Sequence, residues 1–220
     1  MEGMAKKKKH RPVASTPPPP QSIAARMQQT PAEGEANRAS RNSPSLIVVA
    51  ALAASVFLFW YYHGMVLNQM SDLANGITMP DQLMLGYGTD HIEALRGAMN
   101  SDAVGQLNYV HKTAGLMFPL FFALASILAI GLTVPRGLLR WGLWLIPMAF
   151  AVLDLWENNV IDSLFVGALD PGQVTLASTL TIIRWALLFL TFGAMCAALI
   201  YSFVKNFRQK WEDAGLRPLR

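Results

Sequence analysis

Acidic and basic side chains lie inside two otherwise apolar stretches of this 220-residue chain. Asp154, Glu157 and Asn158 fall in one stretch, and Arg184 falls in the next. A lipid bilayer has no water to solvate a charge, so each of these residues needs a partner, a cavity or a proton. Because buried carboxylates can also act as acids, bases or proton carriers, this group is the first candidate for a functional site.

Helical geometry places these residues together. At 100° per residue, Asp154, Glu157, Asn158 and Asp162 fall on one face of a helix, which should point into a helix bundle. Counting rise per residue places Glu157 and Arg184 at similar depths, ~12 Å below the outer surface. We therefore predict an ion pair between them, with Asp154 as a second acceptor for the guanidinium group. The surplus carboxylate leaves two roles open: holding helices together, or a ligand, proton or catalytic role.

A second polar cluster is predicted nearer the outer membrane interface, formed by His63, Asn108, His111 and Asp162. Two imidazoles and a carboxylate are metal-ligand types, but no local motif such as His-x-x-x-His supports a metal here. We therefore expect no metal and no cofactor, and histidines that bond headgroups, water or backbone. The sequence identifies no catalytic residue, because it shows no Ser-His-Asp or Cys-His arrangement at one depth.

The composition excludes a soluble domain of ordinary type. The chain is 53% apolar and only 15% charged, whereas soluble domains average about 25% charged residues. Most Lys and Arg residues lie at the two chain ends, so the net charge of +4 is not a nucleic-acid signal. The single cysteine, Cys196, allows no intrachain disulfide.

The apolar runs predict an all-α, polytopic membrane protein: a four-transmembrane-helix bundle with a short helical outer loop and a disordered N-terminal tail. Alternating hydrophobicity, the signature of a β-barrel, is absent from these runs. The predicted segments are a tail at 1–44, a membrane domain at 45–204 with spans at about 46–66, 111–134, 138–165 and 175–204, an outer loop at 67–110, and a C-terminal tail at 205–220. Within the outer loop, Asp90 and Glu93 suggest a helix-capping box, followed by an apolar stripe of Ile92, Leu95 and Met99.

Positive charge predicts the orientation of the spans. The N-terminal tail carries eight Lys and Arg residues, the C-terminal tail carries five, and the loop between the second and third spans carries Arg136 and Arg140. The long outer loop carries Arg96 alone. Because basic loops stay in the cytoplasm, both termini should be cytoplasmic.

From Asn108 to about Val204, the chain resembles a broad group of uncharacterised four-span bacterial membrane proteins. The resemblance is carried by Tyr109 to Lys112, the Asp-x-x-Glu-Asn element from Asp154 to Asn158, Val174 to Ser178, and the pair Arg184 and Trp185. It implies a four-helix membrane fold in the bacterial inner (plasma) membrane, and it implies no activity.

Together these features favour a non-enzymatic integral membrane protein. Its buried polar cluster would bind a lipid-like or small polar ligand, or would stabilise helix assembly. The expected partners are membrane lipids and either a second copy or another membrane protein, with no nucleic acid. Two alternatives remain open: a proton-linked transport component, and an intramembrane enzyme that uses Glu157 or Asp154 as acid or base.

Overall fold

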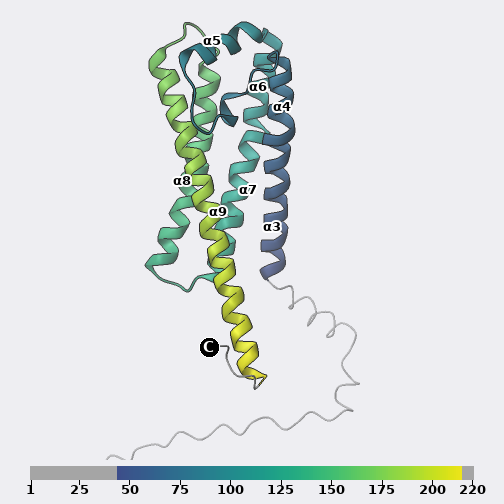
Figure 1. Ribbon diagram of the computed structural model, residues 1–220, viewed down its shortest axis with the longest axis vertical. Helices are drawn as coiled ribbons and strands as arrows, with labels where there is room; N and C mark the ends of the chain where they lie inside the picture. The colour runs from purple at the N-terminus through teal and green to yellow at the C-terminus, as the bar shows by residue number, and fades with distance from the viewer. Residues whose placement is uncertain (1–43, 215–220) are drawn as a thin grey trace, which may run out of the picture. The chain divides into compact units, whose positions relative to one another are not determined.

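The computed structural model describes residues 44–214, whose regular elements are all helical (Figure 1). The predicted disordered tail, apart from Pro44, lies outside the described residues, as do residues 215–220 of the predicted C-terminal tail. In chain order the elements are α3 (Pro44–Phe59), the π-helix η1 (Trp60–Val66), α4 (Leu67–Leu73), the 3-10 helix η2 (Pro80–Gln82), α5 (Thr89–Ala98), α6 (Ser101–Lys112), α7 (Ala114–Thr133), α8 (Leu138–Ser163) and α9 (Pro171–Asp213).

Within residues 44–214, four helices are long and apolar enough to cross a membrane, which confirms the predicted four-span helical bundle. They cover Leu46–Leu73, Ser101–Thr133, Leu138–Ser163 and Pro171–Asp213. Three spans are longer than predicted, because polar helical turns continue beyond the apolar runs on which the prediction depended. The first span continues from α3 through η1 and α4, and the second begins at Ser101, so the outer loop shrinks to residues 74–100. The last helix runs nine residues past the predicted end at Val204.

The helix α7 lies at the centre of the packing. It contacts α3 on one side and α8 and α9 on the other, while α8 and α9 also pack along each other (Figure 1). Its small residues Ala125 and Ala129 are fully buried, which lets neighbouring helices approach closely. Both α3 and α9 pack against α7, and an apolar groove lies between them.

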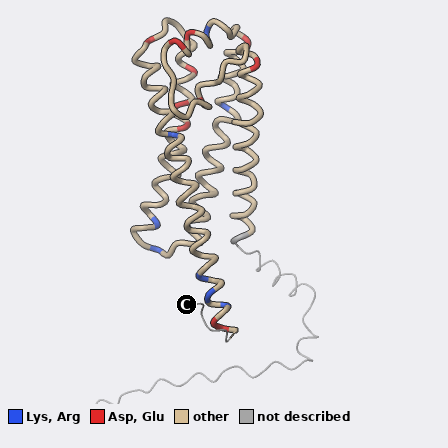
Figure 2. Tube along the Cα trace, viewed as in Figure 1, with Lys and Arg blue, Asp and Glu red and all other residues tan. Residues whose placement is uncertain are grey.

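The outer loop folds over one end of the bundle. The predicted apolar stripe of Ile92, Leu95 and Met99 is present on α5 and is buried. The predicted capping box is wrong: Gly88 occupies the N-cap position without a side-chain hydrogen bond, and Asp90 lies in the first helical turn. Most acidic residues lie toward this end of the bundle and most Lys and Arg residues lie toward the opposite end, although each end also carries charges of the other sign (Figure 2).

Candidate functional site

Arg184 is the centre of a buried ionic network, with only 1% of its surface exposed. The predicted pair is present, because its Nε contacts Oε2 of Glu157. Its Nη1 lies 3.4 Å from Oδ1 of Asp154 and 3.3 Å from Nε2 of His63. Its Nη2 donates to the main-chain carbonyl of Asp81 at 2.5 Å. All three guanidinium nitrogens are therefore engaged by groups from the first span, the third span and the outer loop.

The polar face of α8 points inward as predicted. The Thr181 hydroxyl of α9 lies 2.7 Å from Oε1 of Glu157. Asn158 donates to the carbonyl of Gly115 on α7 at 3.3 Å. That carbonyl lacks a helical donor because Pro119, four residues later, has no N–H. The Asn158 amide therefore satisfies a backbone acceptor that would otherwise be stranded in the membrane.

The second predicted cluster is present in part. Asp162 accepts from the Asn108 amide and from Nδ1 of His111, both at 2.6 Å. His63 does not belong to this cluster, which corrects the prediction. Its ring lies beside Arg184 and packs among Phe59, Phe118 and Trp185 at centroid distances of 4.7 to 5.4 Å.

The error in placing the histidines has a simple origin in helix length. The first span was expected to end at Val66, but it continues to Leu73, ten residues beyond His63. His111 likewise lies ten residues inside a helix that begins at Ser101. Each histidine is therefore ~15 Å from its helix end and bonds protein groups instead of headgroups. Within residues 44–214, no group of three or more His, Cys, Asp or Glu side chains is arranged to hold a metal ion.

Asp81 joins the two clusters into one network, although the sequence did not indicate it as a site residue. Its Oδ1 accepts from the Tyr62 hydroxyl at 2.9 Å, and its Oδ2 lies 3.4 Å from Nε2 of His111. Its carbonyl accepts from Trp185 at 3.0 Å as well as from Arg184. With 1% of its surface exposed, this loop residue is as buried as Arg184 and Asp154 of the spans. The only feature of the sequence that indicated burial of Asp81 was the presence of apolar neighbours in the loop, such as Met79.

Donor and acceptor geometry indicates the protonation states of both histidines. Both ring nitrogens of His111 face carboxylate oxygens, so the ring acts as a doubly protonated donor. A guanidinium group only donates, so Nε2 of His63 must accept and this ring is neutral. Burial alone would raise the pKa of the Asp81 carboxyl, but His111, Arg184 and the Tyr62 hydrogen bond hold that pKa well below its ordinary value.

The network carries more carboxyl groups than cations. Within the described residues, its carboxyl groups are Asp81, Asp154, Glu157 and Asp162, and its cations are His111 and Arg184. Two unbalanced negative charges in a buried site would be costly, so the network favours retained protons. Oδ2 of Asp154 has no hydrogen-bond partner in this part of the chain, which makes Asp154 the best position for one of them.

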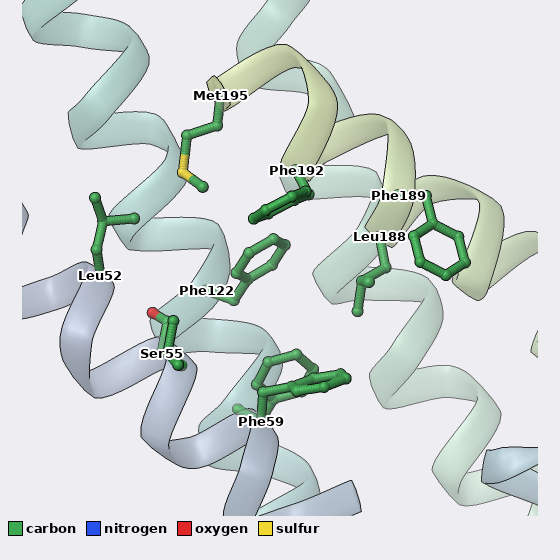
Figure 3. A pocket seen from close by; sticks show the side chains of 10 residues that line it. Leu52, Ser55, Phe59, Phe122, Leu188, Phe189, Phe192 and Met195 are labelled. Carbon is green, nitrogen blue, oxygen red and sulfur yellow. The ribbon is translucent and has the colours of Figure 1, made fainter. Parts of the chain in front are cut away.

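Two hollows lie beside this network, between the first and fourth spans. The first, which we call the apolar groove, has a volume of about 260 Å³, and side chains of α3 and α9 line it on either side of Phe122 (Figure 3). Its lining residues are Leu52, Ser55, Val56, Phe59, Phe118, Phe122, Leu188, Phe189, Phe192 and Met195. Ser55 is the single polar residue among them, and its hydroxyl donates to the Ala51 carbonyl at 2.8 Å.

The second hollow, which we call the outer pocket, has a volume of about 310 Å³. Its lining residues are Phe59, Trp60, His63, Gly64, Gln82, Met84 and Trp185. Phe59 lines both hollows, so the apolar groove and the outer pocket are neighbours at this ring, which stacks on His63 at a centroid distance of 4.7 Å. A third hollow of about 240 Å³ lies on the other side of the network, beside His111 and Asp162.

The fold and site define a four-span helical membrane bundle with a buried ionic network under its outer loop. Comparison of the chain with known protein families, with curated proteins and with solved structures found no match. The resemblance to four-span bacterial membrane proteins therefore stays a prediction.

Proposed function

We propose that this chain is a non-enzymatic integral protein of the bacterial inner membrane that binds a lipid-like ligand in the apolar groove. The observation that carries the proposal is a groove with nine apolar lining residues out of ten, next to a pocket that is lined in part by the polar residues His63 and Gln82 and shares Phe59 with the groove. An amphipathic molecule has the same division between a hydrocarbon chain and a polar head.

The position of the groove supports a ligand drawn from the bilayer. Its rim residues Val56, Phe189 and Phe192 are more than half exposed, at 67%, 54% and 52%. These residues lie in the apolar parts of two spans, where the surrounding medium is lipid. From Leu52 to Phe59 the groove extends ~10 Å along the helix axis, which accommodates part of a chain while the rest stays in the bilayer.

The ionic network supports the groove from one end. Asp81, Glu157 and Asp154 converge on Arg184, which ties the outer loop to the third and fourth spans. In this proposal the network stabilises helix assembly on the outer-loop side of the groove. The enzyme alternative has less support, because neither Asp154 nor Glu157 lines any of the three hollows described.

Charge distribution supports an orientation with both termini in the cytoplasm. Arg136, Arg140 and the basic residues at the end of α9 lie at the end of the bundle opposite the outer loop (Figure 2). This is the arrangement that basic loops adopt in inner-membrane proteins.

Proton-linked transport remains a second candidate function. The specific observation in its favour is the surplus of two carboxyl groups, together with the unpaired Oδ2 of Asp154. A retained proton at this depth is typical of groups that carry protons through membrane proteins.

The proposal is tested by lipid retention in a matched pair of variants. Val56→Trp places an indole in the groove, whereas Val152→Trp places one on an equally exposed part of α8 outside it. Lipid extracted from protein purified in mild detergent is then quantified by mass spectrometry. We expect Val56→Trp to lower bound lipid roughly tenfold, equal to ~1.4 kcal/mol of binding free energy, with little change in Val152→Trp. Equal retention in both variants would exclude the groove as a binding site.

A further inference from the structure

We propose that the ligand of the outer pocket is a neutral lipid alcohol, with an uncharged hydroxyl head, and not an anionic phospholipid. This inference rests on the proposed function and names its ligand class. Three features of the pocket carry it: the charge of its lining, the orientation of the nearest cation, and the unpaired acceptor of Gln82.

The lining of the outer pocket contains no Lys, Arg, Asp or Glu. Two of its walls are the indole rings of Trp60 and Trp185, and a third is the ring of Phe59. A phosphate bound there would lose much of its hydration without a counter-charge, which is costly. An uncharged head avoids that cost.

The nearest cation is not available to an anionic head. The three nitrogens of Arg184 are occupied by Glu157, Asp154, His63 and the carbonyl of Asp81. Its guanidinium carbon lies 4.9 Å from the ring of Trp185, which covers one face of the group. His63 is neutral because it accepts from Arg184, so it adds no positive charge to the pocket.

Gln82 gives the pocket its hydrogen-bonding preference. Its amide nitrogen donates to the His63 carbonyl at 3.0 Å and to Oδ1 of Asn68 at 2.8 Å. Both partners are acceptors, so they fix the orientation of the amide and use its two N–H groups. The Gln82 side-chain oxygen, which has no partner within residues 44–214, remains for the ligand. An acceptor at this position selects a head that donates, such as a hydroxyl group.

A chain-matched pair of probes tests the inference on the full-length protein. The probes are 1-oleoylglycerol and 1-oleoylglycerol 3-phosphate, which differ only in the phosphate group. Binding of each probe at equal concentration is measured by native mass spectrometry of the detergent-solubilised protein. We expect the alcohol to bind roughly tenfold more tightly than the phosphate, the ratio that one unpaired buried polar group produces.

Two variants assign the preference to Gln82. Gln82→Met keeps the length of the side chain but removes the acceptor, so the preference for the alcohol should disappear while chain binding persists. Asn68→Ala removes one partner of the Gln82 amide and leaves the acceptor, so the preference should remain. If Gln82→Met does not fold, the comparison of the two probes on the unmodified protein decides alone.

The outcomes separate the inference from the proposed function. Equal binding of both probes, or tighter binding of the phosphate, overturns the inference; if Val56→Trp also removes that binding, the proposed function stands. Failure of both probes to bind contradicts the proposed function and the inference together.

Discussion

Removing one partner of the Arg184–Glu157 pair should destabilise the bundle strongly. Both side chains are at most 1% exposed, so water cannot take the place of a partner that a substitution removes. Leaving an uncompensated buried charge costs about 3 to 5 kcal/mol in well-buried pairs. Arg184→Gln should reach the upper part of this range, because it also removes the donors to the Asp81 carbonyl and to Oδ1 of Asp154.

Glu157→Gln should cost less than Arg184→Gln. Its amide oxygen can still accept from the guanidinium group, and the hydroxyl of Thr181 remains within hydrogen-bond distance of the side chain. The double variant should be less damaged than the sum of the single variants, by about 0.5 to 3 kcal/mol of coupling.

The assay is thermal or denaturant unfolding in detergent, with Val152→Ala on the lipid-facing side of α8 as the control. Val152 is 65% exposed, so its truncation should change the unfolding midpoint little. Strict additivity of Glu157→Gln and Arg184→Gln would refute the paired arrangement. A harmless Arg184→Gln combined with a damaging Asp154→Asn would show that the carboxylate acts without the arginine, and proton-linked transport would become the better proposal.

Three further predictions concern the outer loop and the topology. Gly86→Ala should lower the unfolding midpoint, at a cost of about 1 to 3 kcal/mol, because the φ of Gly86 is +86° and a Cβ atom there would lie 2.6 Å from a side chain of α9. The control Gly88→Ala should be tolerated, because a Cβ atom at Gly88 would have no heavy atom within 4 Å. Because the pKa of the Asp81 carboxyl is held below its ordinary value, the ionised form adds stability above about pH 4, and that stability is lost as the pH falls further. Asp81→Asn should therefore be less stable than the unmodified protein at neutral pH, and its unfolding midpoint should fall less as the pH is lowered. In a thiol-free background, an impermeant thiol reagent added outside the cell should label Asp170→Cys and not Gly137→Cys, and the reverse pattern would invert the topology.

The sequence was sufficient to predict the number of spans and the ion pair between the third and fourth spans. Charged side chains such as Glu157 and Arg184 inside apolar runs need a polar partner in lipid, and the helix rise per residue places these two at the same depth. The predicted pair followed from these two constraints alone, and the structure contains it.

The sequence was not sufficient for what the outer loop does. Hydropathy marks where lipid contact ends but not where a helix ends, so the first two spans were predicted too short and His63 was placed too near the surface. Asp81 lies in a loop of mixed polarity, where the sequence carries no periodicity that indicates burial. Its position depends on long-range contacts with Tyr62, His111 and Arg184, which only the folded chain brings together.

The most direct test of lipid binding in the apolar groove is photo-crosslinking with a lipid whose acyl chain carries a photoreactive group. The full-length protein in lipid nanodiscs is irradiated, and the modified residues are mapped by mass spectrometry. The proposed function predicts preferential labelling of 52–59 and 188–195, reduced in Val56→Trp, over the lipid-exposed face of α8 around Val152. Uniform labelling of all lipid-exposed helix faces, unchanged in Val56→Trp, would contradict it.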